Sequence, residues 1–294
     1  MDSLRSSPAR IASDLGRGIV SRRSRVVRRY AGAVDAPDLS RLSDGLRLDG
    51  RVAVVTGAGA GIGRSIAEMF AGAGAAVVVS DLKQAAADAV ASGIAKAGGQ
   101  AVGIACNVTK ETDLKAAVET AVNRFGGLTI LVNNAGGGGP KPFNMPMNDF
   151  RWAYELNVFS VFRLCQFAAP HMEKAGGGAV LNISSMSAEN KNQRMASYGS
   201  SKAAVSHLTR NIAFDLGPKG IRVNGIAPGA IRTDALAKVL TPEVEQMMLK
   251  HTPLKRLGEP EDIASAALFL CAPAASWVSG QILTVSGGGV QELD

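Results

Sequence analysis

The chain alternates short apolar strands with longer helix-forming segments, and this alternation limits its possible folds more than any other feature. Strands are predicted from apolar runs at 51–56, 76–80, 100–105, 128–132, 180–183, 221–226 and 282–285. Helical patterns follow at 62–70, 83–97, 111–125, 148–174, 196–216 and 263–271. Such repetition predicts an α/β fold of the Rossmann type, a single doubly wound parallel sheet with helices on both faces.

The first strand leads into a glycine-rich turn with the composition of a phosphate-binding loop. Glycines allow close backbone approach to a pyrophosphate, which the N-terminus of the next helix also favours. The candidate cofactor-binding residues of this turn are Gly57, Gly61, Ile62 and Gly63.

An acidic residue ends the second strand about 20 residues later, as dinucleotide sites require. Asp81 is placed to bind the adenosine ribose hydroxyls and to repel a 2′-phosphate. Ala60 stands where a basic residue would help hold that phosphate, which also favours NAD. Lys83 is a basic residue near Asp81 and is the one feature that favours NADP. NAD is therefore predicted over NADP.

Tyr198 and Lys202 are four residues apart in a predicted helix and therefore share one face. A phenol normally titrates near ~10, too high for a base at neutral pH. A neighbouring ammonium group favours the phenolate and lowers the pKa of the phenol. With Ser185 at the end of the preceding strand, the pair predicts a proton-transfer site, although a chance pairing in a helix is the alternative.

Several motifs fall where predicted strands end: the glycine turn, Asp81, Asn133, Ser185 and Gly229. Ligands of parallel sheets bind beyond the carboxyl ends of the strands. The motifs therefore predict one site at one edge of the sheet.

These motifs together resemble the short-chain dehydrogenase/reductase family. They are Thr56-Gly57-x3-Gly61-Ile62-Gly63, Asn133-Asn134-Ala135-Gly136, Ser185, Tyr198-x3-Lys202 and Pro228-Gly229, and the resemblance covers residues 46–294. It implies an enzyme that transfers a hydride between an alcohol and nicotinamide, with catalytic residues Ser185, Tyr198, Lys202 and Asn157. Tyr198 would exchange the proton, Lys202 would also hold the nicotinamide ribose, and Asn157 would position a water beside Lys202.

The resemblance also implies further cofactor-binding residues: Asn107, Val108, Asn134, Ile231 and Thr233, besides Tyr198 and Lys202. Thr233 would hold the carboxamide. Asn107 departs from the family pattern, which usually has Asp there to accept from the adenine amino group. An Asn carbonyl can also accept, so we expect binding to survive.

Three segments, 133–147, 188–202 and 272–293, resemble the bacterial hydroxysteroid dehydrogenases of this family. They imply that the substrate is the 7α-hydroxyl of a bile-acid-type steroid, bound by Ser185, Tyr198, Asn190 and Gly138, and that the enzyme is a homotetramer. The alternatives are another alcohol or ketone (a sugar, a small alcohol or an acyl thioester) and a nucleotide-binding regulator without catalysis.

Residues 231–253 are rich in Leu, Val and Met. They predict either a pair of core helices or a mobile apolar lid over a hydrophobic substrate, and the lid is preferred.

Composition excludes several other classes. The net charge is +7, but residues 1–30 hold eight Arg and two Asp, so the rest of the chain is nearly neutral and no nucleic-acid surface is predicted. Three scattered histidines predict no metal site, and no apolar run predicts a membrane span. Three unpaired cysteines favour a cytoplasmic enzyme.

Residues 1–45 form a separate Arg/Ser-rich extension, which we predict to be disordered or loosely helical. There are three alternatives for this extension. It is a transit peptide over residues 1–35, a basic tail for anionic surfaces, or upstream sequence included because the start codon was assigned too early. The last is preferred, with the true start near Val34.

Overall fold

The computed structural model describes residues 44–190, 193–238 and 240–289. Seven strands form one sheet: β1 (Val52–Thr56), β2 (Ala76–Asp81), β3 (Gln100–Ala105), β4 (Ile130–Asn133), β5 (Gly178–Ile183), β6 (Ile221–Pro228) and β7 (Ile282–Val285). The α-helices are α3 (Gly61–Gly72), α4 (Gln84–Lys96), α5 (Glu111–Phe125), α6 (Met147–Tyr154), α7 (Ser160–Lys174), α8 (Ala196–Leu216), α9 (Asp234–Ala237), α10 (Pro242–Lys250) and α11 (Pro260–Cys271). The predicted α/β fold is confirmed.

All seven strands are parallel, in the order β3-β2-β1-β4-β5-β6-β7. The order reverses between β1 and β4, so the loops that follow these two neighbouring strands turn toward opposite faces. A crevice for ligands opens at such a point in doubly wound sheets. The glycine turn after β1 and the Asn134–Gly139 segment after β4 border it.

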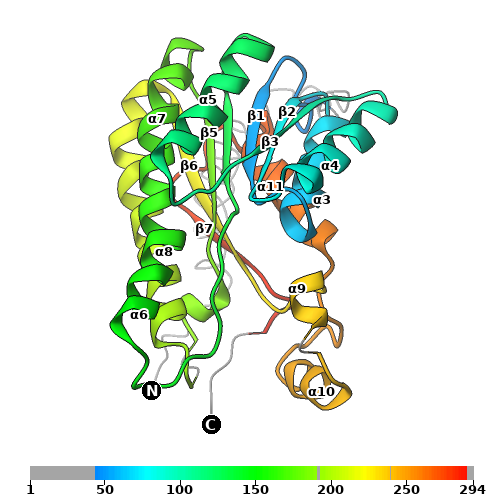
Figure 1. Ribbon diagram of the computed structural model, residues 1–294. Helices are drawn as coiled ribbons and strands as arrows, with labels where there is room; N and C mark the ends of the chain where they lie inside the picture. Colours follow the sequence, from blue (N-terminus) through cyan, green and yellow to red (C-terminus); the bar gives the residue numbers. More distant parts are fainter. Residues whose placement is uncertain (1–43, 191–192, 239, 290–294) are drawn as a thin grey trace, which may run out of the picture. The chain divides into compact units, whose positions relative to one another are not determined.

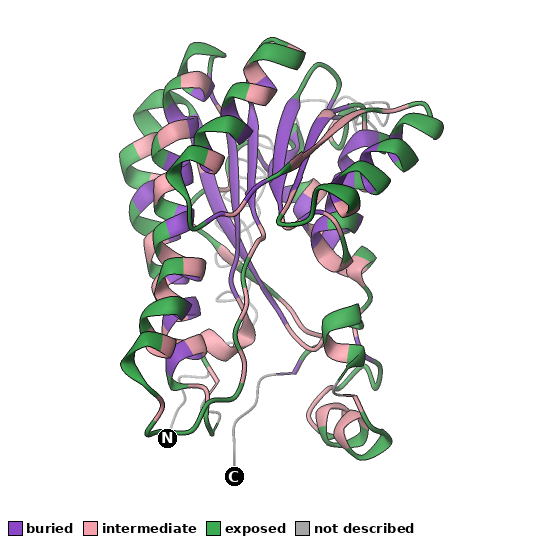
Figure 2. Ribbon diagram, in the orientation of Figure 1, coloured by how far each residue is buried: buried purple, intermediate pink, exposed green. Residues whose placement is uncertain are grey.

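Two helical layers cover the sheet (Figure 1). Helices α3, α4 and α11 pack on one face, around Phe70, Ile66 and Ile263. Helices α5, α7 and α8 pack on the other, around Leu164 and Met172. The five central strands β1, β2, β4, β5 and β6 are largely buried, as expected for strands that are continuous apolar runs, whereas the edge strands β3 and β7 are not. The outer helix faces are exposed (Figure 2).

The predicted long helix at 148–174 is interrupted. A single π-helical turn, Glu155–Phe159, separates α6 from α7. Asn157 lies in this turn and is 1% exposed. Turns of this kind are frequent at functional sites. The Asn157 side chain bonds to Gly137 in the loop after β4.

Of the two alternatives for residues 231–253, the less preferred one, a pair of core helices, is wrong, and the lid stays a prediction. Neither α9 nor α10 contains a buried residue, and in Figure 1 α10 stands apart from the two helical layers. Their apolar side chains do not reach the sheet, because the sheet's faces are already covered. Val239 of this segment is outside the described residues.

The predicted extension at 1–45 lies outside the described residues except for Asp44 and Gly45, and it stays a prediction. Among the helices of the described part, none has both the length and the hydropathy needed to cross a membrane.

Two glycines of α3 allow a matched stability test. A methyl group at Gly63 would overlap the carbonyl oxygen of Gly57 and the side chain of Asn134, whereas one at Gly72 would meet no atom within 4 Å. We expect Gly63→Ala to lower the free energy of unfolding by about 1–3 kcal/mol. Gly72→Ala should raise it by about 0.5–1 kcal/mol. Urea unfolding measures both, and equal effects would contradict the close packing at Gly63.

Candidate active site

The glycine turn after β1 is shaped for close backbone approach. Gly57 and Gly61 have φ of 63° and 54°, in the left-handed region that favours glycine. The Gly59 amide donates to Asp81 Oδ2 over 3.0 Å, and a Cβ on Gly59 would lie 2.7 Å from the Asp81 carboxyl carbon. Asp81 therefore lies directly against the turn. A dinucleotide fits here, since the turn offers bare backbone to a pyrophosphate beside a carboxylate.

Asn134 and Thr56 join the two loops at the crevice. The Asn134 side-chain amide donates to the carbonyls of Thr56 (2.9 Å) and Gly57 (3.1 Å). The Thr56 hydroxyl accepts from the backbone amides of Asn134 (3.1 Å) and Ala135 (3.0 Å). Asn134, predicted to bind the cofactor, thus bonds the glycine turn to the loop after β4. The sequence analysis did not predict the contacts that Thr56 makes here.

Helix α8 brings Tyr198 and Lys202 together, as predicted. The Lys202 ammonium is 5.9 Å from the centre of the Tyr198 ring and donates to the Ile183 carbonyl over 2.8 Å. Lys202 is 4% exposed. Ser185 lies two residues after the end of β5, and its side chain forms a hydrogen bond with the Tyr198 side chain. Ser185, Tyr198 and Lys202, the three side chains predicted to be catalytic, therefore meet at the end of β5, although they come from two different parts of the fold.

Asn157 faces the same point from the other side. Its Oδ1 accepts from the Gly137 amide (3.0 Å), and its Nδ2 donates to the Gly137 carbonyl (2.9 Å) and to the Ser201 hydroxyl (3.0 Å). A Cβ on Gly136 would lie 2.9 Å from Asn157 Oδ1 and 3.0 Å from Lys202 Nζ. The Asn157 and Lys202 polar atoms thus converge on one glycine.

Gly138 continues this loop past the tyrosine ring. Its φ is 138°, and a Cβ there would lie 2.7 Å from Tyr198 Cδ2. Asn190, the other predicted substrate contact, is half-buried just after the short 3-10 helix Met186–Ala188. Gly138 therefore lies at the Tyr198 side chain, while the described contacts of Asn190 are limited to its backbone amide, which donates to Met186.

Burial dominates the electrostatics of the pair. It raises the pKa of Tyr198, an effect that the hydrogen bond with Ser185 partly offsets. It lowers the pKa of Lys202 to about 8. The expectation that Lys202 by itself depresses the pKa of Tyr198 is therefore not met in the protein alone. The physical reason is that burial removes water from the phenolate, and the hydrogen bond with Ser185 makes up only part of that loss.

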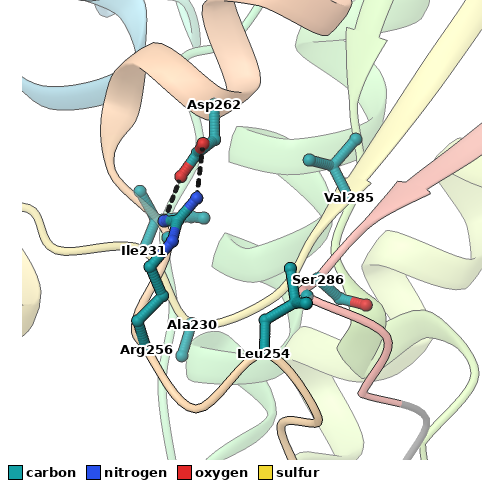
Figure 3. A pocket seen from close by; sticks show the side chains of 9 residues that line it. Ala230, Ile231, Leu254, Arg256, Asp262, Val285 and Ser286 are labelled. Carbon is teal, nitrogen blue, oxygen red and sulfur yellow. Dashed lines mark hydrogen bonds and ion pairs between the residues drawn. The ribbon is translucent and has the colours of Figure 1, made fainter.

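Ile231 and Thr233 approach the glycine turn from the segment after β6. The Thr233 methyl group would lie 3.3 Å from a Cβ on Gly61, and the Thr233 hydroxyl accepts from Leu236 at the start of α9. Ile231 is buried and pairs with Gly258 in a parallel bridge. Behind it lies a cavity of about 170 Å³, where Arg256 and Asp262 form a bidentate ion pair (Figure 3). Thr233 therefore lies at the glycine turn, whereas Ile231 lies in the adjoining buried segment.

Asn107 is used differently from the prediction. Its Oδ1 accepts from the Thr109 amide (3.0 Å) and the Thr109 hydroxyl (2.8 Å). A carbonyl oxygen has two lone pairs, so an adenine amino group would have to displace Thr109. Val108 next to it is buried. The adenine contact of Asn107 therefore stays a prediction that needs a local rearrangement.

Sequence reasoning missed a buried chain of polar groups. Asn133 donates to Asn182 (2.8 Å), and Asn182 donates to the Thr209 hydroxyl (2.9 Å), which links β4, β5 and α8. The only sequence signal was an Asn within the apolar run of β5. Ser184 is likewise buried and bonds to Ser206 and to the Lys202 carbonyl, which favours Ser185 as the exposed hydroxyl of the pair.

Known proteins share these features. A family model described as enoyl-(acyl carrier protein) reductase matches residues 57–289. The chain is 68% identical over 252 residues to 7α-hydroxysteroid dehydrogenase from Escherichia coli strain K12, which covers 86% of this chain and 99% of that protein. It is 38% identical over 245 residues to 3-oxoacyl-[acyl-carrier-protein] reductase from Aquifex aeolicus, with 83% and 98% covered.

A solved structure agrees in fold as well as in sequence. It is a 7α-hydroxysteroid dehydrogenase in complex with NADH and 7-oxoglycochenodeoxycholic acid, with a TM-score of 0.84, 67% identity, and 86% of this chain and 99% of that chain covered. The chain therefore belongs to the short-chain dehydrogenase/reductase family and is an oxidoreductase. The resemblance seen in the sequence motifs is confirmed.

The buried ammonium group makes a testable difference to stability. The pKa of Lys202 is about 8 in the folded protein, against about 10.4 in an unfolded chain. Between these pH values the unfolded state binds more protons, so this group adds stability as pH rises. We expect the stability of Lys202→Met relative to the wild type to fall by about 2 kcal/mol between pH 7 and pH 10. Denaturant unfolding across that range measures it, and parallel pH profiles would contradict a buried, depressed Lys202.

Proposed function

We propose that this protein oxidises the 7α-hydroxyl group of bile-acid-type steroids with NAD. The observation that carries the proposal is the cluster of Ser185, Tyr198 and Lys202 at one strand end, in a chain 68% identical to a 7α-hydroxysteroid dehydrogenase. The structure of such an enzyme with NADH and a 7-oxo bile acid supports both the cofactor and the substrate class.

The crevice supports NAD as the cofactor. The bare backbone of the glycine turn would hold the pyrophosphate, and Asp81 beside it would accept from the ribose hydroxyls and repel a 2′-phosphate. Lys202 would hold the nicotinamide ribose, and Thr233, which lies against Gly61, would hold the carboxamide. Bound there, NAD supplies the hydride acceptor.

The protein's own residues supply position and proton transfer. The Ser185 hydroxyl would hold the substrate oxygen, and the Tyr198 phenolate would accept its proton. Lys202, whose pKa is about 8, can exchange a proton near neutral pH, and Asn157 beside it would direct the proton toward solvent. Since burial raises the pKa of Tyr198, the basic form increases with pH and oxidation should become faster as pH rises.

The apolar surface near the site suits a hydrophobic substrate. Helices α6 and α10 both extend beyond the carboxyl ends of the strands (Figure 1). Phe143, Met147 and Trp152 are exposed in and before α6, as are Met247 and Leu254 in and after α10. A steroid between such surfaces would bury apolar area on both of its faces. We therefore propose that α9 and α10 form the lid over the substrate.

The alternative is another alcohol or ketone. The match to 3-oxoacyl-[acyl-carrier-protein] reductase at 38% identity favours an acyl thioester as the second candidate. Such a substrate would use the same Ser185, Tyr198 and Lys202 chemistry.

Two bile acids separate these possibilities. Cholate and deoxycholate differ only by the 7α-hydroxyl group, so we expect NADH formation with cholate alone. Tyr198→Phe should lower kcat at least about 100-fold and leave NAD affinity near normal. Absorbance at 340 nm and NAD titration measure these effects. Turnover of both acids would assign another hydroxyl, and turnover of neither would contradict the steroid.

We also propose a homotetramer. Phe159 and Phe162 are exposed beside α5 and α7, and the open edge strand β7 lies near exposed Phe214, Trp277 and Leu283. Two such apolar faces suit two self-complementary contacts with other copies of the chain. The three buried, unpaired cysteines support a cytoplasmic location.

Native mass spectrometry tests the assembly. We expect four copies for the wild type, and two copies for either Phe162→Glu or Leu283→Glu, because each places a charge in a different apolar contact. The double variant should be a monomer. A monomeric wild type would contradict the proposal.

A further inference from the structure

Helix α10 is held in place by few contacts. No residue of α10 is buried, and it has no extensive packing against any other helix or strand within the described ranges. Its first turn is capped by Thr241, and at its end Lys255 donates to the carbonyls of Leu249 and Lys250. These bonds stabilise the helix but do not fix its position. A helix with so little burial belongs to the low-stability part of a fold.

One side chain reaches α10 from the cofactor crevice. Arg232 lies between Ile231 and Thr233, and its backbone amide donates to the Gly258 carbonyl over 2.7 Å. Its guanidinium forms an ion pair with Glu245 of α10 at 2.9 Å and another with Glu259 at 3.3 Å. The segment that borders the crevice is thus tied directly to the lid helix.

The two carboxylates differ in how firmly they are held. Glu259 caps α11, and Asp262 completes the capping box and accepts two bonds from Arg256. Figure 3 shows the Arg256–Asp262 pair beside Ile231. Glu245, in contrast, is on the loosely packed α10. Arg232 therefore bridges a fixed group and a movable one.

We infer that Arg232, through its ion pairs with Glu245 and Glu259, is a positioning residue that couples the lid helix α10 to the cofactor-binding segment. This coupling, which we call the Arg232 latch, rests on the proposed function of the site. All three side chains are substantially exposed, 49% for Arg232, 31% for Glu245 and 50% for Glu259. Exposed ion pairs are weak, so the latch releases readily and shifts the lid population about two- to five-fold.

The latch gives the cofactor and the substrate a physical connection. A cofactor that orders Ile231 and Thr233 also orders Arg232, and the ordered guanidinium holds α10 closer to its latched position. The lid then closes more often when the cofactor is bound, which favours binding of cofactor before substrate. Loss of the latch should weaken substrate binding without changing the chemical step.

A double-mutant cycle with hydrogen exchange tests the latch. The variants are Arg232→Met, Glu245→Gln and their combination. Glu243→Gln is the matched control, since Glu243 is an acid in the same helical turn that makes no ion pair with Arg232 in the described structure. We expect backbone amides of residues 242–250 to exchange about two- to five-fold faster in each single variant. The combination should exchange no faster than Arg232→Met. The control removes a first-turn carboxylate that bonds to the N-cap residue Thr241, so its effect on exchange should be smaller than that of Glu245→Gln and should add to that of Arg232→Met.

Kinetics and salt give two further readouts. KM for the alcohol should rise about two- to five-fold in both single variants with kcat unchanged. The difference in exchange between wild type and Arg232→Met should vanish near ~1 M NaCl, where ion pairs are screened.

Unchanged exchange in α10, or additive effects of the two substitutions, would overturn the latch. Exchange needs no turnover, so this result is distinct from failure of the steroid assay, which concerns only the proposed substrate.

Discussion

The site depends on the reversal of strand order between β1 and β4. Neighbouring parallel strands whose helices pass to opposite faces leave a crevice between their loops. The Asn134 and Thr56 side chains span this crevice and bond its two walls through four contacts. Those bonds satisfy backbone groups that would otherwise be unpaired. They therefore fix the distance between the glycine turn and the loop after β4.

Buried polar groups give the site its precision at some cost in stability. Lys202 is buried with its ammonium on a backbone carbonyl, and Asn133, Asn182 and Thr209 form a chain beneath it. Each group would be costly if unpaired, and each is bonded, so the arrangement tolerates few alternatives. This rigidity suits a tyrosine that must remain within reach of one substrate oxygen. Burial penalises the charge on Lys202, so the proposed catalytic role of this residue comes at a cost in stability.

The proposed lid is built from the opposite kind of interaction. Helix α10 has no buried residue, and its ion pair with Arg232 is exposed to solvent. If α10 acts as the proposed lid, a weak, screened contact would let it open and close, whereas a buried contact of the same groups would hold it in one state. The difference between the buried, hydrogen-bonded residues around Lys202 and the weakly held helix α10 therefore reflects how far each is buried.

Sequence patterns determined most of the fold and the main members of the site. Helix α5 matches its predicted range, strand boundaries agree within two residues, and Ser185, Tyr198, Lys202 and Asn157 meet as expected, because strand and helix periodicity are local properties. The tertiary structure alone decided the rest. The π-helical turn at Asn157, which bonds to Gly137 and Ser201, the exposure of α9 and α10 and the raised pKa of Tyr198 each depend on partners distant in sequence or on desolvation. No local pattern encodes either, since burial is set only when the whole chain has packed.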